Sequence, residues 1–214
     1  MIKKENTINA WKHSIRFLLQ EGNDFKDKDG RLCREIFNLK IDIEEPWKDI
    51  TTPIELISDS KNWVYPRIDE IANSTLSRKH SPGHIYIYGE RIFNFENKIN
   101  QIDEFIIPLL RKDPLSRRAI LNLWNPNKDS NEFNKEIPSI INGIFIVDDQ
   151  NINVTVTIRS QNLYFGFPAN IYQIYLLQEY IAQRLNKNTG KITLFILSAH
   201  IFEENFEDAR RVII

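Results

Sequence analysis

Asn142-Gly143-Ile144-Phe145-Ile146-Val147 and Asn153-Val154-Thr155-Val156-Thr157-Ile158 are two runs rich in the branched and aromatic residues typical of strands. The polar link Asp148-Asp149-Gln150-Asn151 joins them, and a short polar link between two such runs indicates a β-hairpin. A hairpin pairs its strands antiparallel, so the sheet that contains it cannot be purely parallel. This pair of runs therefore favours an α+β fold, with one mixed sheet flanked by helices, over a doubly wound fold.

Further elements are expected on both sides of this hairpin. Residues 171–185 are apolar around much of a helical circumference, which is typical of a buried helix. Residues 192–197 form an apolar run that predicts a buried strand, and residues 206–213 predict a short terminal helix. Upstream of the hairpin, the spacing predicts a helix over residues 99–110 and a strand over residues 118–124.

The N-terminal third is less regular. Residues 8–19 carry apolar side chains at helical spacing, and Thr7 is the expected cap of this helix. Residues 23–31 are polar and predict a loop, whereas residues 33–43 alternate and predict a strand. A short helix is expected over residues 68–76, in a segment that otherwise shows weak periodicity.

Composition limits the classes of function. The 214 residues include 28 Lys and Arg against 29 Asp and Glu, a formal net charge of −1. This balance argues against a nucleic-acid partner or a membrane surface, either of which calls for a basic excess. No apolar run approaches the roughly 20 residues that span a bilayer. One cysteine, Cys33, cannot form an internal disulfide, so we expect a cytoplasmic protein in a reducing compartment.

Two arginine motifs are candidate anion sites. Arg117 and Arg118 follow the turn Asp113-Pro114-Leu115-Ser116, and guanidinium groups offer planar forks for phosphate oxygens. Taken alone, such a pair is more often a solvated surface pair than an anion site. Arg159 and Ser160 are expected at a strand end, shortly before the turn Gly166-Phe167-Pro168-Ala169-Asn170, and could form a second cradle.

The histidines give no metal constellation. His200 ends an apolar strand in Ser198-Ala199-His200, where a histidine is more often a packing residue than a catalyst. His13, His80, His84 and His200 show no ligand spacing among themselves, so we expect no metal site.

Together, the order and spacing of these segments resemble thymidylate synthases, particularly the short archaeal-type members. The similarity runs along essentially the whole chain, which predicts one domain of that type over residues 1–214. The segments that carry it are Asn9-Ala10-Trp11, Arg34-Glu35-Ile36, Tyr88-Gly89, Gln101-Ile102, Asp113-Pro114-Leu115-Ser116-Arg117-Arg118-Ala119-Ile120, Trp124-Asn125-Pro126, Arg159-Ser160, Pro168-Ala169-Asn170 and Ser198-Ala199-His200.

The resemblance implies a homodimer whose large sheets pack back to back, with active sites completed across the interface. It implies that Arg159 and Ser160 hold the 5′-phosphate of a pyrimidine nucleotide together with Arg117 and Arg118 of the other subunit. A further arginine of the family would stand at Lys28 in Asp27-Lys28-Asp29-Gly30, with Arg31 close by. Lysine lacks the bidentate fork, so this cradle is altered.

The resemblance also assigns the base and sugar contacts. Asn170 matches the asparagine that reads the pyrimidine edge, and because the cytosine-modifying branch has aspartate there, a uracil base is favoured. Asn162 replaces an aspartate near the folate site. His200 matches a histidine of the family, whereas Phe202 replaces a tyrosine whose hydroxyl reaches the sugar.

The family nucleophile is missing. The resemblance calls for a cysteine after Pro138, where this chain has Ser139, and for a neighbouring histidine, where it has Ile140. A hydroxyl is a far weaker nucleophile than a thiol and needs a positioned base. Cys33 lies far away in the sequence and is expected to be a buried packing residue.

Another family residue, a glutamate on a helix, has no convincing counterpart. The acids in that general region are Glu55, Asp69, Glu70 and Glu90.

Two functions follow from these residues. The first is a protein that binds a pyrimidine nucleoside 5′-monophosphate and has lost or altered its C5 methyl transfer. The second is an active methyl- or hydroxymethyltransferase, with Ser139 and His200 in the catalytic positions and 5,10-methylenetetrahydrofolate as cofactor. The clustered departures favour the first, as a product of natural divergence.

Overall fold

One mixed sheet dominates the computed structural model, which describes residues 1–214 except 28, 60–62, 80–86 and 135. The strand order is β1-β3-β7-β6-β5-β4, and β2 pairs with β3 outside this path. β1 and β3 are parallel, as are β6 and β7, whereas the other pairs are antiparallel. The strands are β1 (Ile2–Lys4), β2 (Asn23–Lys26), β3 (Leu32–Ile43), β4 (Ile120–Asn122), β5 (Ile140–Asp148), β6 (Asn151–Asn162) and β7 (Asn188–Phe202). The mixed α+β architecture expected from the hairpin is confirmed.

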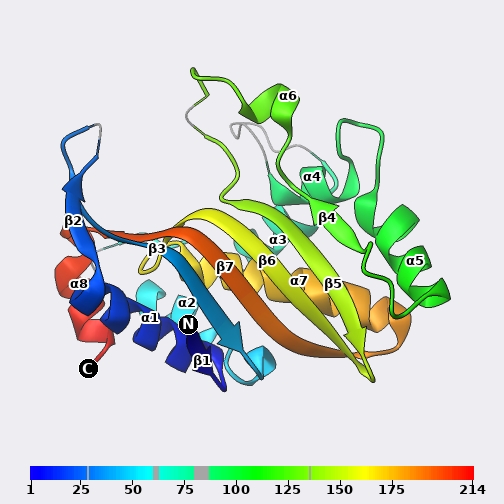
Figure 1. The fold of residues 1–214 in the computed structure, drawn as a ribbon, viewed down its shortest axis with the longest axis horizontal. Helices are drawn as coiled ribbons and strands as arrows, with labels where there is room; N and C mark the ends of the chain where they lie inside the picture. The colour runs from blue at the N-terminus through cyan, green and yellow to red at the C-terminus, as the bar shows by residue number, and fades with distance from the viewer. Residues whose placement is uncertain (28, 60–62, 80–86, 135) are drawn as a thin grey trace.

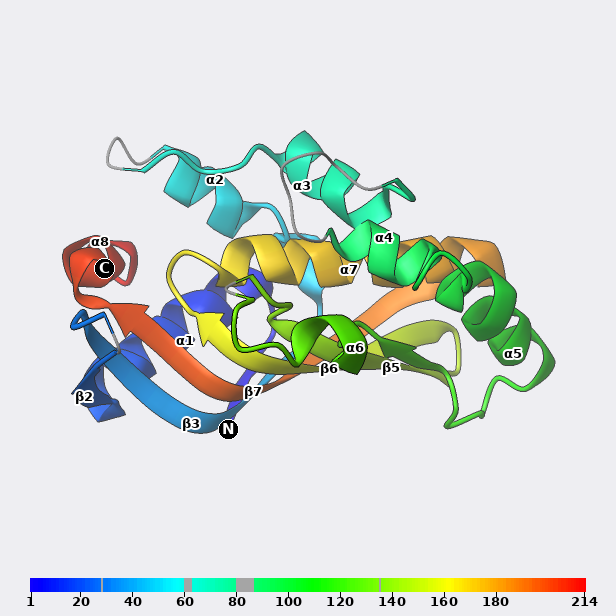
Figure 2. The same cartoon turned by 90° about the horizontal axis from the view of Figure 1, so that it is seen from above.

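The helices gather on one face of this sheet. Figure 2 shows α2, α3, α4 and α7 on the same side, with the long helix α7 lying along the strands. The helices are α1 (Thr7–Glu21), α2 (Thr52–Ser58), α3 (Ile68–Leu76), α4 (Tyr88–Phe93), α5 (Ile107–Lys112), α6 (Pro126–Asp129), α7 (Phe167–Leu185) and α8 (Phe206–Val212). A π-helical turn, Gln101–Ile106, leads into α5, and 3₁₀ turns cover Pro46–Lys48 and Glu203–Asn205.

The main core lies between the helices and the sheet. Trp11 and Ile15 of α1 pack with Ile41 of β3, and all three side chains are fully buried. The Trp11 indole N–H donates to the carbonyl oxygen of Leu163 at 2.7 Å, so the core also fixes the turn after β6. Burying an aromatic ring together with its polar atom requires such a partner.

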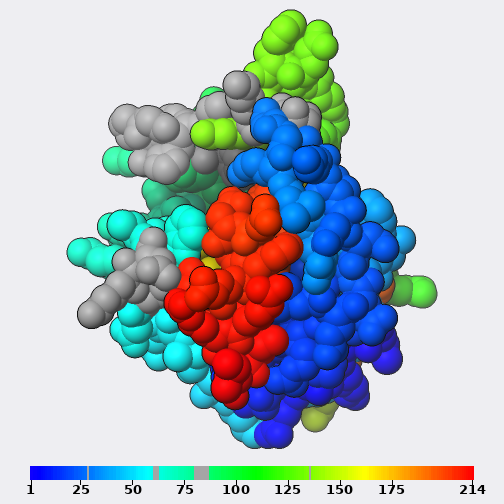
Figure 3. All heavy atoms as spheres, turned by 90° about the vertical axis from the view of Figure 1, so that its left-hand side faces the viewer, coloured from blue at the N-terminus to red at the C-terminus, as the bar shows by residue number. Residues whose placement is uncertain are grey.

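The C-terminal helix α8 closes one end of the molecule. In Figure 3 its red atoms lie between the blue N-terminal segment and the cyan segment around α2. The Arg16 guanidinium donates to the carbonyl oxygen of Ile213 at 2.8 Å, and the Trp63 indole donates to Asp208 at 2.8 Å. These bonds tie the C-terminus to two segments that lie far from it in the sequence.

Three local expectations were wrong. The first helix is capped by Asn6, whose side chain accepts the Asn9 N–H at 3.2 Å, and Thr7 is already its first helical residue. Residues 23–26 form β2 instead of a loop, because the start of β3 offers this polar segment a pairing partner and Arg34 holds Asp24 at 2.8 Å. The strand expected over 118–124 shrinks to β4, since pairing with β5 covers only residues 120–122.

Candidate functional site

Ser139 immediately precedes β5 and lies beside β6. The Arg159 backbone N–H donates to the Ser139 carbonyl oxygen at 2.9 Å, next to the paired residues Ile140 and Ile158. The Ser139 backbone is therefore held in line with the strand, and its position is set by the register of the hairpin that the sequence predicts.

The Arg159 side chain holds the same segment from the other side. Its Nε donates to the Pro138 carbonyl oxygen at 2.9 Å and its Nη2 donates to the Ile137 carbonyl oxygen at 3.0 Å. A guanidinium has five N–H groups, so three are left for other partners. Arg159 thus links the predicted phosphate site to the segment that carries Ser139.

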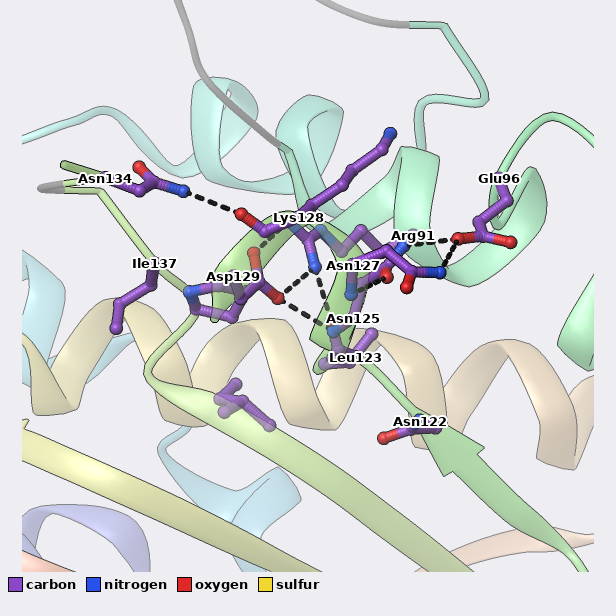
Figure 4. A network of polar contacts seen from close by, with 12 residues as sticks. Arg91, Glu96, Asn122, Leu123, Asn125, Asn127, Lys128, Asp129, Asn134 and Ile137 are labelled. Carbon is purple, nitrogen blue, oxygen red and sulfur yellow. Dashed lines mark hydrogen bonds and ion pairs between the residues drawn. The ribbon is translucent and has the colours of Figure 1, made fainter. Parts of the chain in front are cut away.

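Helix α4 supports the segment at two further points. The Tyr88 hydroxyl accepts the Ile140 N–H at 3.2 Å, and the buried Arg91 guanidinium donates to Asp129 at 2.7 Å and to the Leu123 carbonyl oxygen at 2.9 Å. Asp129 in turn accepts the Asn125 N–H at 2.8 Å, which closes a network around α6 (Figure 4). Helix α4 is therefore joined to α6 by a buried ion pair and to the start of β5 by the Tyr88 hydroxyl.

A cavity of about 930 Å³ lies between α3, α4, α7 and residues 136–139. Of the predicted site residues that the structure describes, it brings together Ser139 and Asn170. Other residues along the wall are Glu70, Ser74, Tyr88, Glu136 and Gln173. The volume lies near the upper end of the range for small-molecule sites.

Ser160, a predicted phosphate contact, and the other predicted base and sugar residues cluster at the ends of β6 and β7. Ser160 pairs with Ser198 and Asn162 pairs with His200. The Asn162 side-chain oxygen accepts the N–H groups of Tyr164 and Phe165 at 3.0 and 2.9 Å, so it caps the turn after β6. None of Ser160, Asn162 or His200 is among the described residues that line the cavity.

His200 is electrically neutral at pH 7. Burial lowers the pKa of its imidazole to about 4, and the positive charges of Arg31 and Arg159 add to this effect against a backbone contact at Ser198. A neutral imidazole with so low a pKa is a weak base. His200 can therefore donate or accept a hydrogen bond at the site, but it is poorly suited to activating a hydroxyl group.

The Phe202 ring lies between His200 and Arg31. It lies 5.1 Å from the His200 ring, and the Arg31 guanidinium carbon lies 4.0 Å from the Phe202 ring centroid. Arg31 also contacts Asp27 at 3.0 Å. Lys28, the predicted phosphate ligand on this loop, lies outside the described residues.

Arg117 and Arg118 lie elsewhere in the protomer. Both are exposed and precede β4, which runs in the same direction as β6 because each is antiparallel to β5. Since Ile120 aligns with Ile144 and Ile144 with Thr155, Arg159 lies about six residues, or about 20 Å, further along the strands. One chain therefore does not bring the two arginine motifs together.

The candidate acidic residues and Cys33 lie in different environments. Glu70 lines the cavity, whereas Glu55 is exposed because Ile54 and Ile57 use the inward face of α2. Cys33 is buried in β3, and burial together with the nearby Glu35 carboxylate raises the pKa of its thiol to about 11. The expected packing role of Cys33 is confirmed, because a thiol with this pKa is inert near neutral pH.

Two further polar side chains of this region, those of Gln161 and Arg31, were not predicted from the sequence to be site residues. Gln161 is buried beside Asn170, and Arg31 lies over Phe202. A glutamine inside a β-rich run is a weak signal of a site residue. Its burial becomes evident only when the turn after β6 is in place.

The family profile of thymidylate synthase matches residues 9–213, a range that includes every described residue lining the cavity. The chain belongs to the thymidylate synthase family. A protein of Methanosarcina barkeri named "Putative thymidylate synthase" is 29% identical over 213 residues, which cover 100% of this chain and 94% of that protein.

Other members of the thymidylate synthase family are similar over different lengths. The protein of the same name from Methanothermobacter thermautotrophicus is 26% identical over 221 residues, covering 99% of this chain and 97% of that protein. The thymidylate synthase of Mycoplasma pneumoniae is 29% identical over 124 residues, covering 58% of this chain and 42% of its own length. The similarity to the archaeal proteins thus extends along the whole chain.

Two kinds of feature are absent from the described residues. Among the described helices of this thymidylate synthase family member, none is long and apolar enough to cross a membrane. Within the same described part of the chain, no three His, Cys, Asp or Glu side chains gather in a way that could hold a metal ion.

Proposed function

We propose that this thymidylate synthase family member binds a pyrimidine nucleoside 5′-monophosphate with a uracil base and has lost most of its C5 methyl transfer. The observation that carries the proposal is that Ser139 and Asn170 line one cavity of about 930 Å³. Asn170 supplies the amide for the base edge, and Ser139 stands where the family nucleophile is required.

The chemistry of the side chains around Ser139 supports the loss of methyl transfer. The chain has one cysteine, and Cys33 is buried in β3 with a raised pKa. A serine hydroxyl needs a base to become a nucleophile, and the low pKa of His200 makes that residue a weak one. In this proposal His200 serves as a hydrogen-bonding group near the sugar, with Phe202 and Asn162 beside it.

The phosphate is proposed to lie against Arg159 and Ser160, with Lys28 as a further cation and with Arg117 and Arg118 donated by a second copy of the chain. The two arginine motifs lie at opposite ends of the sheet, so a two-fold arrangement is needed to unite them. Apolar side chains on the open face of the sheet favour such a homodimer. Those exposed are Ile120, Ile146, Phe195 and Leu197.

The alternative function is an active folate-dependent C5 methyl- or hydroxymethyltransferase that converts dUMP to dTMP or a related product. The size of the cavity favours it, because α3 and α7 line it with carboxylate, hydroxyl and amide groups that are not needed for the nucleotide. Glu70, Ser74 and Gln173 suit a heterocycle rich in donors and acceptors, such as 5,10-methylenetetrahydrofolate, which would supply the one-carbon unit.

Two measurements separate these functions. Calorimetric titration with dUMP, UMP, dCMP and CMP tests binding, and release of tritium from 5-tritiated dUMP with methylenetetrahydrofolate tests chemistry at C5. We expect binding of a uracil nucleotide without release of tritium. Release at a rate ordinary for the family would establish the alternative, and failure of all four nucleotides to bind would contradict both functions.

A further inference from the structure

Gln161 makes two hydrogen bonds of opposite sense beside the proposed base site. It lies in β6 and is 1% exposed. Its Nε2 donates to the Asn162 carbonyl oxygen at 3.1 Å, and its Oε1 accepts from Nδ2 of Asn170 at 2.9 Å. The side chain therefore connects the backbone of the turn after β6 to Asn170, which lines the cavity together with Ser139.

The hydrogen bond to Asn162 fixes the orientation of the Gln161 side-chain amide. A backbone carbonyl can only accept, so the amide nitrogen of Gln161 must face it and the amide oxygen must face Asn170. The Asn162 carbonyl also accepts the Gly166 N–H at 3.0 Å, and the Asn162 side chain caps the turn. The acceptor that sets the direction is therefore itself held by the turn.

Gly166 packs closely against the Gln161 amide. A Cβ atom at Gly166 would lie 2.9 Å from Nε2 of Gln161 and 3.2 Å from the Asn162 carbonyl oxygen, closer than such contacts normally come. The glycine allows the turn to lie directly on the glutamine side chain. Gln161 therefore has little freedom to rotate its amide.

The orientation of the Gln161 amide in turn fixes the orientation of the Asn170 amide. If the Asn170 amide were reversed, its oxygen would face the Gln161 oxygen, and two buried acceptors would be left without a donor between them. With the observed direction, Asn170 has one N–H and its side-chain oxygen free to contact a ligand in the cavity. The order of this donor and acceptor is fixed before any ligand binds.

We propose that Gln161 is a specificity-determining residue, which fixes the donor and acceptor order of Asn170 and thereby selects uracil over cytosine. The inference rests on the proposed function. Uracil presents an N3–H donor beside the O4 acceptor, whereas cytosine presents the N3 acceptor beside the N4 amino donor. An asparagine that could reverse its amide would accept either base, and an asparagine held by Gln161 matches only one of them.

The test compares the dissociation constants of dCMP and dUMP, measured by calorimetry, in the wild type and in two glutamine variants. We expect the wild type to prefer dUMP by about 10- to 100-fold, the usual effect of an unpaired polar edge. Gln161→Met keeps the length of the side chain but removes its acceptor, and we expect the preference to fall to within about threefold.

Gln178→Met is the matched control. Gln178 is a second fully buried glutamine whose Nε2 donates to backbone carbonyls, at 2.6 Å to Ile152 and 3.1 Å to Gly190, away from Asn170. Its replacement is expected to lower stability and leave the ratio of the two dissociation constants unchanged. Because the readout is a ratio, a merely structural effect that weakens both nucleotides equally does not mimic the predicted one.

Gln161→Glu tests the same idea with a side chain of the same size, should the methionine variant not fold. Its carboxylate still accepts from Asn170, so the preference for dUMP is expected to persist although both affinities fall. A wild type that binds dUMP and dCMP equally, an unchanged preference in Gln161→Met, or a lost preference in Gln161→Glu would each overturn the role of Gln161 while leaving nucleotide binding intact. A wild type that binds neither nucleotide would instead contradict the proposed function.

Discussion

Arg159 donates from Nε to the Pro138 carbonyl oxygen at 2.9 Å, so one guanidinium both faces the proposed phosphate site and holds the residue before Ser139. The backbone N–H of Arg159 also donates to the Ser139 carbonyl oxygen. The segment that carries the serine is therefore expected to depend on the same residue that we propose to bind the phosphate.

Arg159→Lys tests this double role. A lysine retains the charge but not the fork, so it cannot hold two carbonyl oxygens and a phosphate at once. We expect the affinity for dUMP to fall by roughly 10- to 100-fold, because a charged hydrogen bond contributes about 1.5–3 kcal/mol. Calorimetry measures the change, and uncharged deoxyuridine should lose less affinity than dUMP. An equal loss for both ligands would show that Arg159 acts only on the shape of the segment.

Ser139→Cys is expected to restore part of the missing chemistry. A thiol is intrinsically far more nucleophilic than a hydroxyl, and the neighbouring Arg159 favours the thiolate. We predict tritium release from 5-tritiated dUMP above the level of the wild type, but below that of an ordinary family member because Ile140 replaces a histidine. Ser139→Ala is the control and should match the wild type. Release by the wild type equal to that of Ser139→Cys would contradict the assigned defect.

The hairpin, the buried helix and the terminal helix could be predicted because their signals are local. Residues 140–162 carry strand-forming side chains on both sides of a polar turn, and α7 is apolar around most of its surface. The bounds of α3, Ile68–Leu76, follow from its periodicity alone. In contrast, β2 is exposed at every position and polar at all but Phe25, and only its pairing with β3 makes it a strand.

The candidate site was predictable only where a motif marks it. Ser139 and Asn170 lie 31 positions apart in the sequence, and the structure places both on one cavity. The hydrogen bonds of Gln161 depend on the backbone path of the turn that contains Asn162 and Gly166. No sequence pattern predicts that path. The same holds for Arg91, whose partner Asp129 is 38 residues away.

The buried ion pair between Arg91 and Asp129 is expected to be a main determinant of stability around α6. Their side chains are 8% and 0% exposed, and loss of one member leaves an unpaired charge in the interior. We predict that Arg91→Met lowers the free energy of unfolding by about 3–5 kcal/mol in urea denaturation. In a double-mutant cycle, Arg91→Met with Asp129→Leu should recover part of this loss.

Arg67→Met is the control for this ion pair, because Arg67 and Asp69 are 72% and 59% exposed and such pairs contribute little. Its effect on the free energy of unfolding is expected to stay below about 1 kcal/mol. If Arg91→Met cost no more than Arg67→Met, the buried ion pair in Figure 4 would not be what holds α6 against α4.

Phe195→Lys tests the proposed homodimer. Phe195 lies on the open face of the sheet, next to Thr157 of β6, and is 43% exposed in one chain. A lysine there would be buried unpaired against a second copy, so we expect light scattering to show a monomer and the affinity for dUMP to fall as the partner's Arg117 and Arg118 are lost. Val64→Lys, at an exposed position outside the sheet, should change neither. A wild type that is monomeric and still binds dUMP would contradict the two-chain site.

His200 is expected to make stability fall as the pH is lowered from about 6.5 to 4. The pKa of its imidazole is about 4 in the folded chain, against about 6.5 when unfolded, because burial disfavours the charged form. Between these values the unfolded chain binds one proton more than the folded chain, so acid favours unfolding, and above pH 6.5 the difference vanishes.

The loss amounts to about 2–3 kcal/mol, at about 1.4 kcal/mol for each unit of pKa difference. Urea denaturation at pH 7.5, 5.5 and 4.5 should show a smaller loss in His200→Gln than in the wild type. His13→Gln should lie closer to the wild type, because His13 is only partly buried, although burial and the charges of Lys4 and Arg16 also lower the pKa of its imidazole. Parallel pH profiles for His200→Gln and the wild type would mean that the pKa of the His200 imidazole is not lowered by burial.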